Sequence, residues 1–181
     1  MSLSLDGATG NITGLGVLSP QLPSGSVINT VKAQTDTAVS ITTRTFTDTT
    51  LSASITTTSA SSKVLVLVDQ QIQFYSAIGS HQGCGIKLLR GSTTIHDPLQ
   101  DSSSSFEYWH DNTGATGSNF YTRAHLQYLD TPGAVGTYTY KTQGIVYVID
   151  TVTPANGIMR CQNTTGSGDK GTSYITLLEV A

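Results

Sequence analysis

Two histidines in this chain stand directly beside an aspartate, and this pairing can support general acid–base chemistry. His96 precedes Asp97, and His110 precedes Asp111. A catalytic triad would also need a serine on a strained turn, and the Gly-x-Ser-x-Gly pattern of such turns does not occur in the sequence. Glu107 and Asp111 could be imagined as a glycosidase pair, but carboxylates in a serine-rich loop are more often solvated. We therefore expect no enzymatic activity and assign no catalytic residue.

Metal and phosphate sites have no better support in the sequence. The four histidines include no pair at a close ligand spacing, and the two cysteines, Cys84 and Cys161, lie far apart. The glycine-rich stretch 79–85 lacks the Lys-Ser/Thr that completes a phosphate-binding loop. We expect no metal and no cofactor. Two free, partly buried thiols are the favoured state of the cysteines, and the spacing leaves a disulfide open.

One stretch is suited to recognition, because it gathers aromatic residues within the polar loop 98–119. The cluster consists of Phe106, Tyr108, Trp109 and His110. Aromatic rings supply rigid stacking area, neighbouring hydroxyls supply adaptable hydrogen bonds, and Trp and Tyr suit the apolar faces of sugars. These four residues are the candidate surface or glycan-binding loop. The alternative is that Trp109 closes one end of the core or packs at a subunit interface.

The composition argues against several classes of partner. Charged residues make up 12% of the chain and the net charge is −3, whereas nucleic acid and anionic membranes require clustered Lys and Arg. No apolar run approaches the roughly 20 residues that span a bilayer, so we expect no membrane insertion. The first residues have neither the basic region nor the apolar core of a secretory signal, which predicts synthesis and assembly in a reducing cytoplasm.

Residues 1–25 differ from the rest of the chain. They contain five glycines and scattered apolar residues without helical spacing. Such a segment could bury its apolar side chains only against another surface, which predicts an extended arm that docks on a partner. A frayed terminus is the alternative. The candidate anchoring residues are Leu3, Leu5, Ile12, Leu15, Val17 and Leu18.

The remaining residues, 26–181, show the alternation of β-strands. Leu51, Ala53 and Ile55 fall on one face of a segment whose other face is Ser and Thr. Further strands are expected within 26–34, 39–49, 63–75, 120–133, 136–151, 158–164 and 173–181, with a hairpin around Gly91 in 84–97. Ser and Thr account for 50 of the 181 residues, and β-branched Thr favours strands.

No apolar pattern of helical spacing persists for three turns. We therefore predict an all-β chain forming a single antiparallel β-sandwich or jelly-roll-like domain, with an extended N-terminal arm. The Ser/Thr-rich tract 47–68 is predicted to be a hairpin inside this domain, with 57–62 as its loop, and not a disordered linker. In this tract Ser and Thr take the water-facing positions that most proteins give to charged residues.

Five segments in combination resemble a family of small virion proteins of tailed bacteriophages, especially those of marine bacteria and cyanobacteria. The segments are LPSGSVINTVKAQT, FTDTTLSASITTTSASSKVLVLV, GIKLLRGSTTI, YLDTPGAVGTYTYKTQ and SYITLLEVA. The resemblance covers residues 22–181, and its motifs are specific only together. It implies a structural, non-enzymatic protein of the tail-fibre-like or generic virion kind, and it carries no catalytic residue over to this chain.

The leading hypothesis is a homotrimeric tail-fibre-like module, attached to the virion through its arm and facing the host. The alternative is a capsid decoration, or cement, protein that stabilises the head; a carbohydrate-binding protein or glycan-active enzyme is a weaker third. Partners would be further copies of the chain, capsid or tail proteins, and a host surface glycan. The expected location is the virion, assembled in the bacterial cytoplasm.

Overall fold

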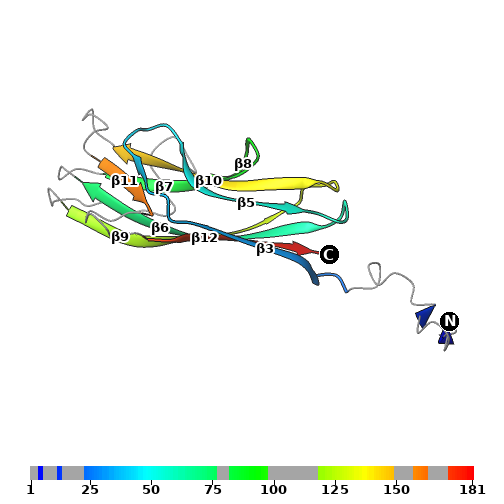
Figure 1. The fold of residues 1–181 in the computed structure, drawn as a ribbon. Helices are drawn as coiled ribbons and strands as arrows, with labels where there is room; N and C mark the ends of the chain where they lie inside the picture. Colours follow the sequence, from blue (N-terminus) through cyan, green and yellow to red (C-terminus); the bar gives the residue numbers. More distant parts are fainter. Residues whose placement is uncertain are drawn as a thin grey trace.

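In the computed structural model, the described residues are 4–5, 12–13, 23–76, 82–97, 118–148, 157–162 and 171–181. They form strands and turns, and no helix occurs among them. Ten strands build two antiparallel sheets that pack face to face (Figure 1). The predicted all-β antiparallel sandwich is thereby confirmed.

The larger sheet has six strands arranged around the long strand β6. Its members are β3 (Val27–Thr35), β4 (Val39–Ile41), β6 (Lys63–Ser76), β9 (Ser118–Asp130), β11 (Gly157–Cys161) and β12 (Ser173–Val180). Strand β9 pairs with one edge of β6 along its whole length. The other edge of β6 is shared by β12 and then β11, behind which lie β3 and β4.

The smaller sheet has the strand order β5-β10-β7-β8. Its members are β5 (Thr47–Thr56), β7 (Gln82–Arg90), β8 (Thr93–His96) and β10 (Thr137–Val148). The strands β3-β12-β6-β9 of the larger sheet form one four-stranded layer, and the strands of the smaller sheet form the other. The chain crosses repeatedly from one layer to the other. This eight-stranded arrangement is a jelly roll, to which β4 and β11 are added.

Alternating side chains place the core between the two sheets. In β5 the apolar residues Leu51, Ala53 and Ile55 are buried, while the intervening Ser and Thr residues are exposed. The same alternation along β12 buries Ile175 and Leu177. Burying one face of each strand supplies the main driving force for packing the sheets.

A bulge interrupts the pairing of β5 with β10 near the start of β5. Between Asp48 and Ser52, three residues of β5 stand opposite one residue of β10, while Thr49 and Leu51 keep the inward orientation of the alternating pattern. Thr50, at the bulge, has a φ of 67°, a left-handed conformation that β-branched residues rarely adopt. Its hydroxyl donates to the carbonyl of Thr37 at 3.3 Å, which helps to hold this conformation.

The tract 47–68 is ordered, but the predicted hairpin is wrong. Strands β5 and β6 belong to different sheets, and residues 57–62 carry the chain from one sheet to the other. Glu179 holds this crossover, because one of its carboxylate oxygens accepts hydrogen bonds from the Thr58 amide at 2.6 Å and the Thr58 hydroxyl at 2.9 Å. Each of the two strands has one apolar face. Because the crossover puts the strands in different sheets, the two apolar faces meet across the core.

Two further expectations concern turns. The predicted strand 39–49 is divided, because β4 ends at Ile41 and β5 begins at Thr47 in the other sheet. The predicted hairpin around Gly91 is confirmed: β7 and β8 pair, and Gly91 has a φ of 59°. A glycine is favoured there because residues with a Cβ rarely adopt positive φ.

The chain enters and leaves the sandwich at the same end. The Gly25 amide donates to the Ala181 carbonyl at 2.8 Å, and the Ala181 amide donates to the Ser26 carbonyl at 3.0 Å. At the opposite end, Ser76, Ser118 and Gly157 stand in register at the ends of β6, β9 and β11 (Figure 1). The strand ends that flank 77–81 and 149–156 therefore lie away from the two chain termini of the sandwich. Of the two strands joined by 98–117, β9 starts at that far end, whereas β8 ends at His96 opposite Leu88, near the β7–β8 turn.

Within the predicted arm, β1 (Ser4–Leu5) pairs antiparallel with β2 (Ile12–Thr13). Residues 1–3, 6–11 and 14–22 lie outside the described part of the chain. The division of the chain into an arm at 1–25 and a domain at 26–181 stays a prediction.

Candidate functional site

The sequence-predicted recognition residues cannot be placed from the described part of the chain. Phe106, Tyr108, Trp109 and His110 lie outside it. The same holds for four of the anchoring residues, and for Leu5 and Ile12 only the backbone pairing of β1 and β2 is described. The aromatic loop and the docking arm therefore stay predictions.

Histidines and acidic residues do not gather into a metal site within the described ranges. No group of three His, Cys, Asp or Glu side chains there could hold an ion. His96 lies with its ring 6.1 Å from that of Tyr128, and His125 Nδ1 lies 3.5 Å from an oxygen of Asp69. Among the described residues there is also no helix long and apolar enough to cross a membrane.

Both cysteines are free thiols buried in the core, which confirms the favoured expectation. Burial raises the pKa of Cys84 well above its ordinary value and raises that of Cys161 to about 12. Only the thiolate is an effective nucleophile, so at neutral pH both side chains behave as small apolar core residues.

The first polar cluster between the sheets is ionic and includes Asp130, at the end of β9. Arg90 Nη1, from β7, lies 3.0 and 2.8 Å from the two carboxylate oxygens of Asp130. The hydroxyl of Tyr140, from β10, donates to the same carboxylate at 2.7 Å. Asp130 is 6% exposed and Tyr140 is fully buried, whereas the Arg90 side chain is 26% exposed, so this cluster joins the two sheets at the margin of the core.

The environment of Tyr140 keeps its hydroxyl protonated. Burial, together with the hydrogen bond to Asp130, raises the pKa of Tyr140 well above its ordinary value. A phenol with a raised pKa that already donates to a carboxylate is a structural donor and not a general base at neutral pH.

The second polar cluster is neutral and crosses the middle of the sandwich. Gln70 Oε1, from β6, accepts from the Thr142 hydroxyl at 2.8 Å, and Thr142 is also hydrogen-bonded to Thr49 of β5. On the other side of Gln70 lie Ser173 and Gln162. With its amide oxygen toward Gln70, Gln162 accepts from Gln70 Nε2 at 2.6 Å and from the Ser173 hydroxyl at 2.9 Å.

All five side chains of this neutral cluster are at most 1% exposed. Buried amides and hydroxyls cost free energy unless they are hydrogen-bonded, and here each has a partner. Sequence reasoning missed this cluster, although a signal was present: Gln70 occupies a core-facing position between Val68 and Ile72. The two clusters thus use their polar atoms to join the sheets, which leaves them unavailable for catalysis.

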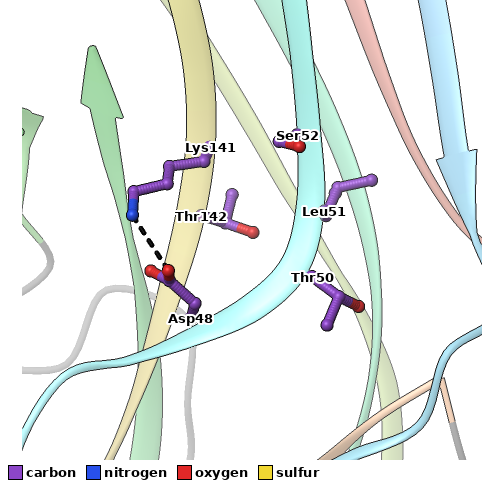
Figure 2. A pocket seen from close by; sticks show the side chains of 6 residues that line it. All are labelled: Asp48, Thr50, Leu51, Ser52, Lys141 and Thr142. Carbon is purple, nitrogen blue, oxygen red and sulfur yellow. Dashed lines mark hydrogen bonds and ion pairs between the residues drawn. The ribbon is translucent and has the colours of Figure 1, made fainter. Parts of the chain in front are cut away.

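A shallow hollow lies over the bulge of β5, on the outside of the smaller sheet (Figure 2). Figure 2 shows Lys141 and Asp48 turned toward each other there, with Nζ 2.9 Å from a carboxylate oxygen. Gln143 donates to the other oxygen at 2.7 Å. The hydrogen bond from Lys141, aided by that from Gln143, holds the pKa of Asp48 below its ordinary value despite partial burial. Because its two charges satisfy each other, the hollow offers no unpaired charge to a ligand.

The rest of this outer surface on β5 and β10 is a row of hydroxyl groups, which we call the hydroxyl face. Ser54 and Thr139 are hydrogen-bonded at 2.7 Å, and Thr56 and Thr137 at 2.8 Å. All four residues are exposed. The expectation that Ser and Thr occupy water-facing strand positions is therefore confirmed for this strand pair.

The outer surface of the larger sheet is different, because it carries an apolar patch near the chain termini of the sandwich. In register across the strands, Leu65 stands between Leu129 and Leu178. Leu129 is 50% exposed, and Val27 at the start of β3 is 52% exposed. We call Val27, Leu65, Leu67, Leu129, Leu178 and Val180 the apolar face.

Next to the apolar face lies an ionic group on the same surface. Arg123 Nε is 2.6 Å from a carboxylate oxygen of Asp69, and Arg123 Nη2 donates to the Thr172 carbonyl at 2.9 Å. The ring of Tyr174 lies 4.8 Å from Lys32 Nζ. These charges contact groups on their own sheet, so they border the apolar face without forming an anion or cation site.

Comparisons with known proteins give only a distant likeness. No family model and no curated protein matches the chain. Among solved structures, the chain is similar to a chain of the T13 infectious bursal disease virus particle, with 12% identity and a TM-score of 0.39 over 100% of this chain and 40% of that one. For the VP2 subviral particle of the same virus, the values are 11%, 0.37, 100% and 46%.

This chain thus spans less than half the length of either viral chain. At these TM-scores the likeness carries no argument about the function of the present chain. Its fold rests on the strand topology described above.

Proposed function

We propose that this chain is a structural component of a tailed-phage virion, a non-enzymatic module attached to the particle surface through its N-terminal arm, tail-fibre-like and facing the host. The observation that carries this proposal is the two-ended layout of the jelly roll. Gly25 and Ala181 pair at one end, so the arm leaves from that end. The aromatic cluster precedes β9 in the chain, and β9 starts at the other end of the sandwich.

Three further points support a structural role. Residues 22–181 resemble small virion proteins of tailed phages in sequence. The polar groups between the sheets hold the sandwich together, as the bonds of Asp130 and Gln70 illustrate. A jelly roll by itself serves many functions, so the fold alone does not select among them. The proposal includes a homotrimer and a host surface glycan as the ligand of the loop.

The second candidate is a capsid decoration protein, which would also be a virion component. The apolar face favours it, because a protein that clamps neighbouring subunits needs a lateral surface to bury. A free carbohydrate-binding protein is the third candidate, and its support is the aromatic loop alone.

The copy number per particle tests these candidates. Quantitative mass spectrometry of purified virions and of tailless heads should find a small number of copies that are lost together with the tails. Hundreds of copies retained on tailless heads would favour decoration and contradict the tail-fibre-like role. A protein absent from purified particles would contradict both virion roles.

The arm is tested by deletion of residues 1–22. The truncated chain should keep the melting temperature of the full chain, because Pro23 and the residues after it begin the described sandwich. It should no longer bind particles that lack the protein. Retained binding would contradict the docking role of the arm.

The loop is tested by Trp109→Ala, with Trp109→Phe as the matched variant that keeps an aromatic ring. We expect Trp109→Ala to abolish binding to host cells or glycan arrays and to leave the melting temperature within a few degrees. A large fall in the melting temperature would instead assign Trp109 to the core or to a subunit interface.

A further inference from the structure

Among the described residues, strand β9 forms one edge of the larger sheet, and this edge is unusually long. It has 13 residues, all of which pair with β6 in one continuous register without a bulge. Among the described residues, β6 is the only strand that pairs with β9. A long, regular edge presents a row of backbone donors and acceptors that can template pairing with another strand.

Within its own residues, β9 lacks several of the devices that protect sheet edges. Between Ser118 and Asp130 there is neither proline nor lysine. Arg123 is turned to Asp69 and the Thr172 carbonyl, and Asp130 is turned inward to Arg90 and Tyr140. These two charges are therefore engaged within the molecule and do not shield the edge.

The side chains of β9 are arranged so that the strand complements a second copy of itself. On its outer face, Tyr121 and Leu129 are each 50% exposed and stand four residues on either side of His125. An antiparallel pairing about a two-fold axis at His125 would place Tyr121 of one copy opposite Leu129 of the other. The same pairing would place Arg123 opposite Gln127.

Neighbouring registers are less favourable. An axis at Ala124 would set Arg123 opposite His125 and leave Leu129 opposite Asn119. An axis at Leu126 would set Arg123 opposite Leu129. On the outer face, only the axis at His125 pairs the exposed Tyr121 and Leu129 and sets Arg123 opposite an amide. The same axis sets Phe120, which is 44% exposed on the other face, opposite Asp130. Aromatic–aliphatic pairs across strands are stabilising, which favours this register.

We propose that two copies of this chain join through the free edges of their β9 strands, antiparallel about a two-fold axis at His125. The two larger sheets then form one continuous sheet across the dimer. The contact is isologous, as in most soluble homo-oligomers. Leu129 belongs to both the edge and the apolar face, so the apolar faces of the two copies become parts of one surface. In an assembly of trimers, this contact joins one trimer to the next.

Disulfide capture tests the contact and its register on the full chain. Opposed residues in an antiparallel pair lie about 4.5–5.5 Å apart at Cα, which is within the range of a disulfide. Cys84 and Cys161 are buried, so a new exposed thiol can be followed without interference. His125→Cys should give a covalent dimer on mild oxidation. Ser54→Cys, on the exposed face of the edge strand β5, is the matched control and should remain monomeric on a denaturing gel.

A charge pair at position 127 tests the same register in solution. Gln127 is exposed, so neither variant should disturb the fold. Opposite Arg123 of the second copy, Gln127→Glu should tighten the dimer and Gln127→Lys should weaken it, each by about threefold or more in sedimentation equilibrium. If general repulsion between two chains of net charge −3 controlled dimerisation, the Gln127→Glu dimer would instead be weaker than the unmodified dimer.

Three results would overturn the proposal. The first is a monomer or an isolated trimer, without a two-fold contact, at high protein concentration. The second is equal crosslinking of the His125→Cys and Ser54→Cys variants. The third is a strand of another protein paired with β9. None of them bears on the presence of the chain in virions, which the copy-number measurement decides separately.

Discussion

Strands β5 and β10 carry similar hydroxyl pairs on both of their faces, and the two faces use them differently. On the inner face, Thr49 and Thr142 bond to each other and to Gln70 of the opposite sheet, away from water. On the outer face, Ser54 and Thr139 bond across the same two strands at solvent-exposed positions. Water can replace the outer bond at little cost, whereas a lost inner bond leaves a buried polar group unsatisfied.

Two carboxylates extend this comparison. Asp130 is 6% exposed and accepts hydrogen bonds from Arg90 and Tyr140 between the sheets. Asp48 is largely exposed and accepts from Lys141 and Gln143 on the outside. The bonds are similar in length, so burial and not geometry should decide how much each contributes to stability. Variants on the two faces can test this.

The largest effect is expected from Asp130→Asn, which removes the charge that Arg90 and Tyr140 share. Breaking a buried ion pair costs about 3 kcal/mol or more, so the melting temperature should fall by about 9 °C. Asp48→Asn is the matched outer variant and should cost less than about 1 kcal/mol. Thermal unfolding followed by circular dichroism measures both. Equal losses would show that burial does not control these carboxylates.

Thr142→Val should have the next largest effect, because valine keeps the shape of threonine and loses the donor to Gln70. Leaving the Gln70 oxygen and the Thr49 hydroxyl short of a partner costs about 1–3 kcal/mol. Urea denaturation measures the change in the free energy of unfolding. Gln70→Leu, which removes the acceptor, should not add its full cost when combined with Thr142→Val, since the two residues share one network.

The pH dependence of stability tests the inner cluster without changing the fold at neutral pH. Above the ordinary tyrosine pKa of about 10, the unfolded chain releases the phenolic proton of Tyr140 and the folded chain keeps it. The unfolded state then binds fewer protons, so stability falls as pH rises, by up to about 1.4 kcal/mol per pH unit. Tyr140→Phe should show a shallower decline above pH 10; an identical decline would contradict a role for this group.

The smallest effect is expected from Thr139→Val on the hydroxyl face. Its hydrogen bond to Ser54 is exposed, so the free energy of unfolding should change by less than about 0.5 kcal/mol in urea denaturation. This variant is the direct counterpart of Thr142→Val on the same strand. A loss comparable to that of Thr142→Val would show that the outer hydroxyl pairs also stabilise the sheet.

Much of the fold followed from local alternation, and the exceptions have a common cause. The patterns around Leu51, Gly91 and Ile175 placed strands and a turn correctly. The hairpin predicted for 47–68 is wrong because alternation identifies strands but not the sheet to which each belongs. The division of 39–49 has the same origin: the chain changes sheets after Ile41, and a period-2 pattern carries no signal for that change.

The candidate sites were less accessible to sequence reasoning than the strands. The aromatic loop and most of the arm lie outside the described residues, so their predicted roles await experiment. The buried clusters were missed because their partners are distant in the chain; Thr49 and Thr142, for example, are 93 residues apart. The edge of β9 was equally hidden, since its sequence matches that of any half-buried strand.

The all-β class, the position of most strands and the apolar face of strands such as β5 could be predicted from the amino-acid sequence. These properties depend on the period of two along a single strand, which is a local consequence of backbone geometry. The pairing of the strands, the joining of the two sheets by Asp130 and Gln70, and the place of β9 at the edge of the described sheet come from the tertiary structure. Those properties depend on contacts between residues far apart in the chain, and local alternation contains no information about them.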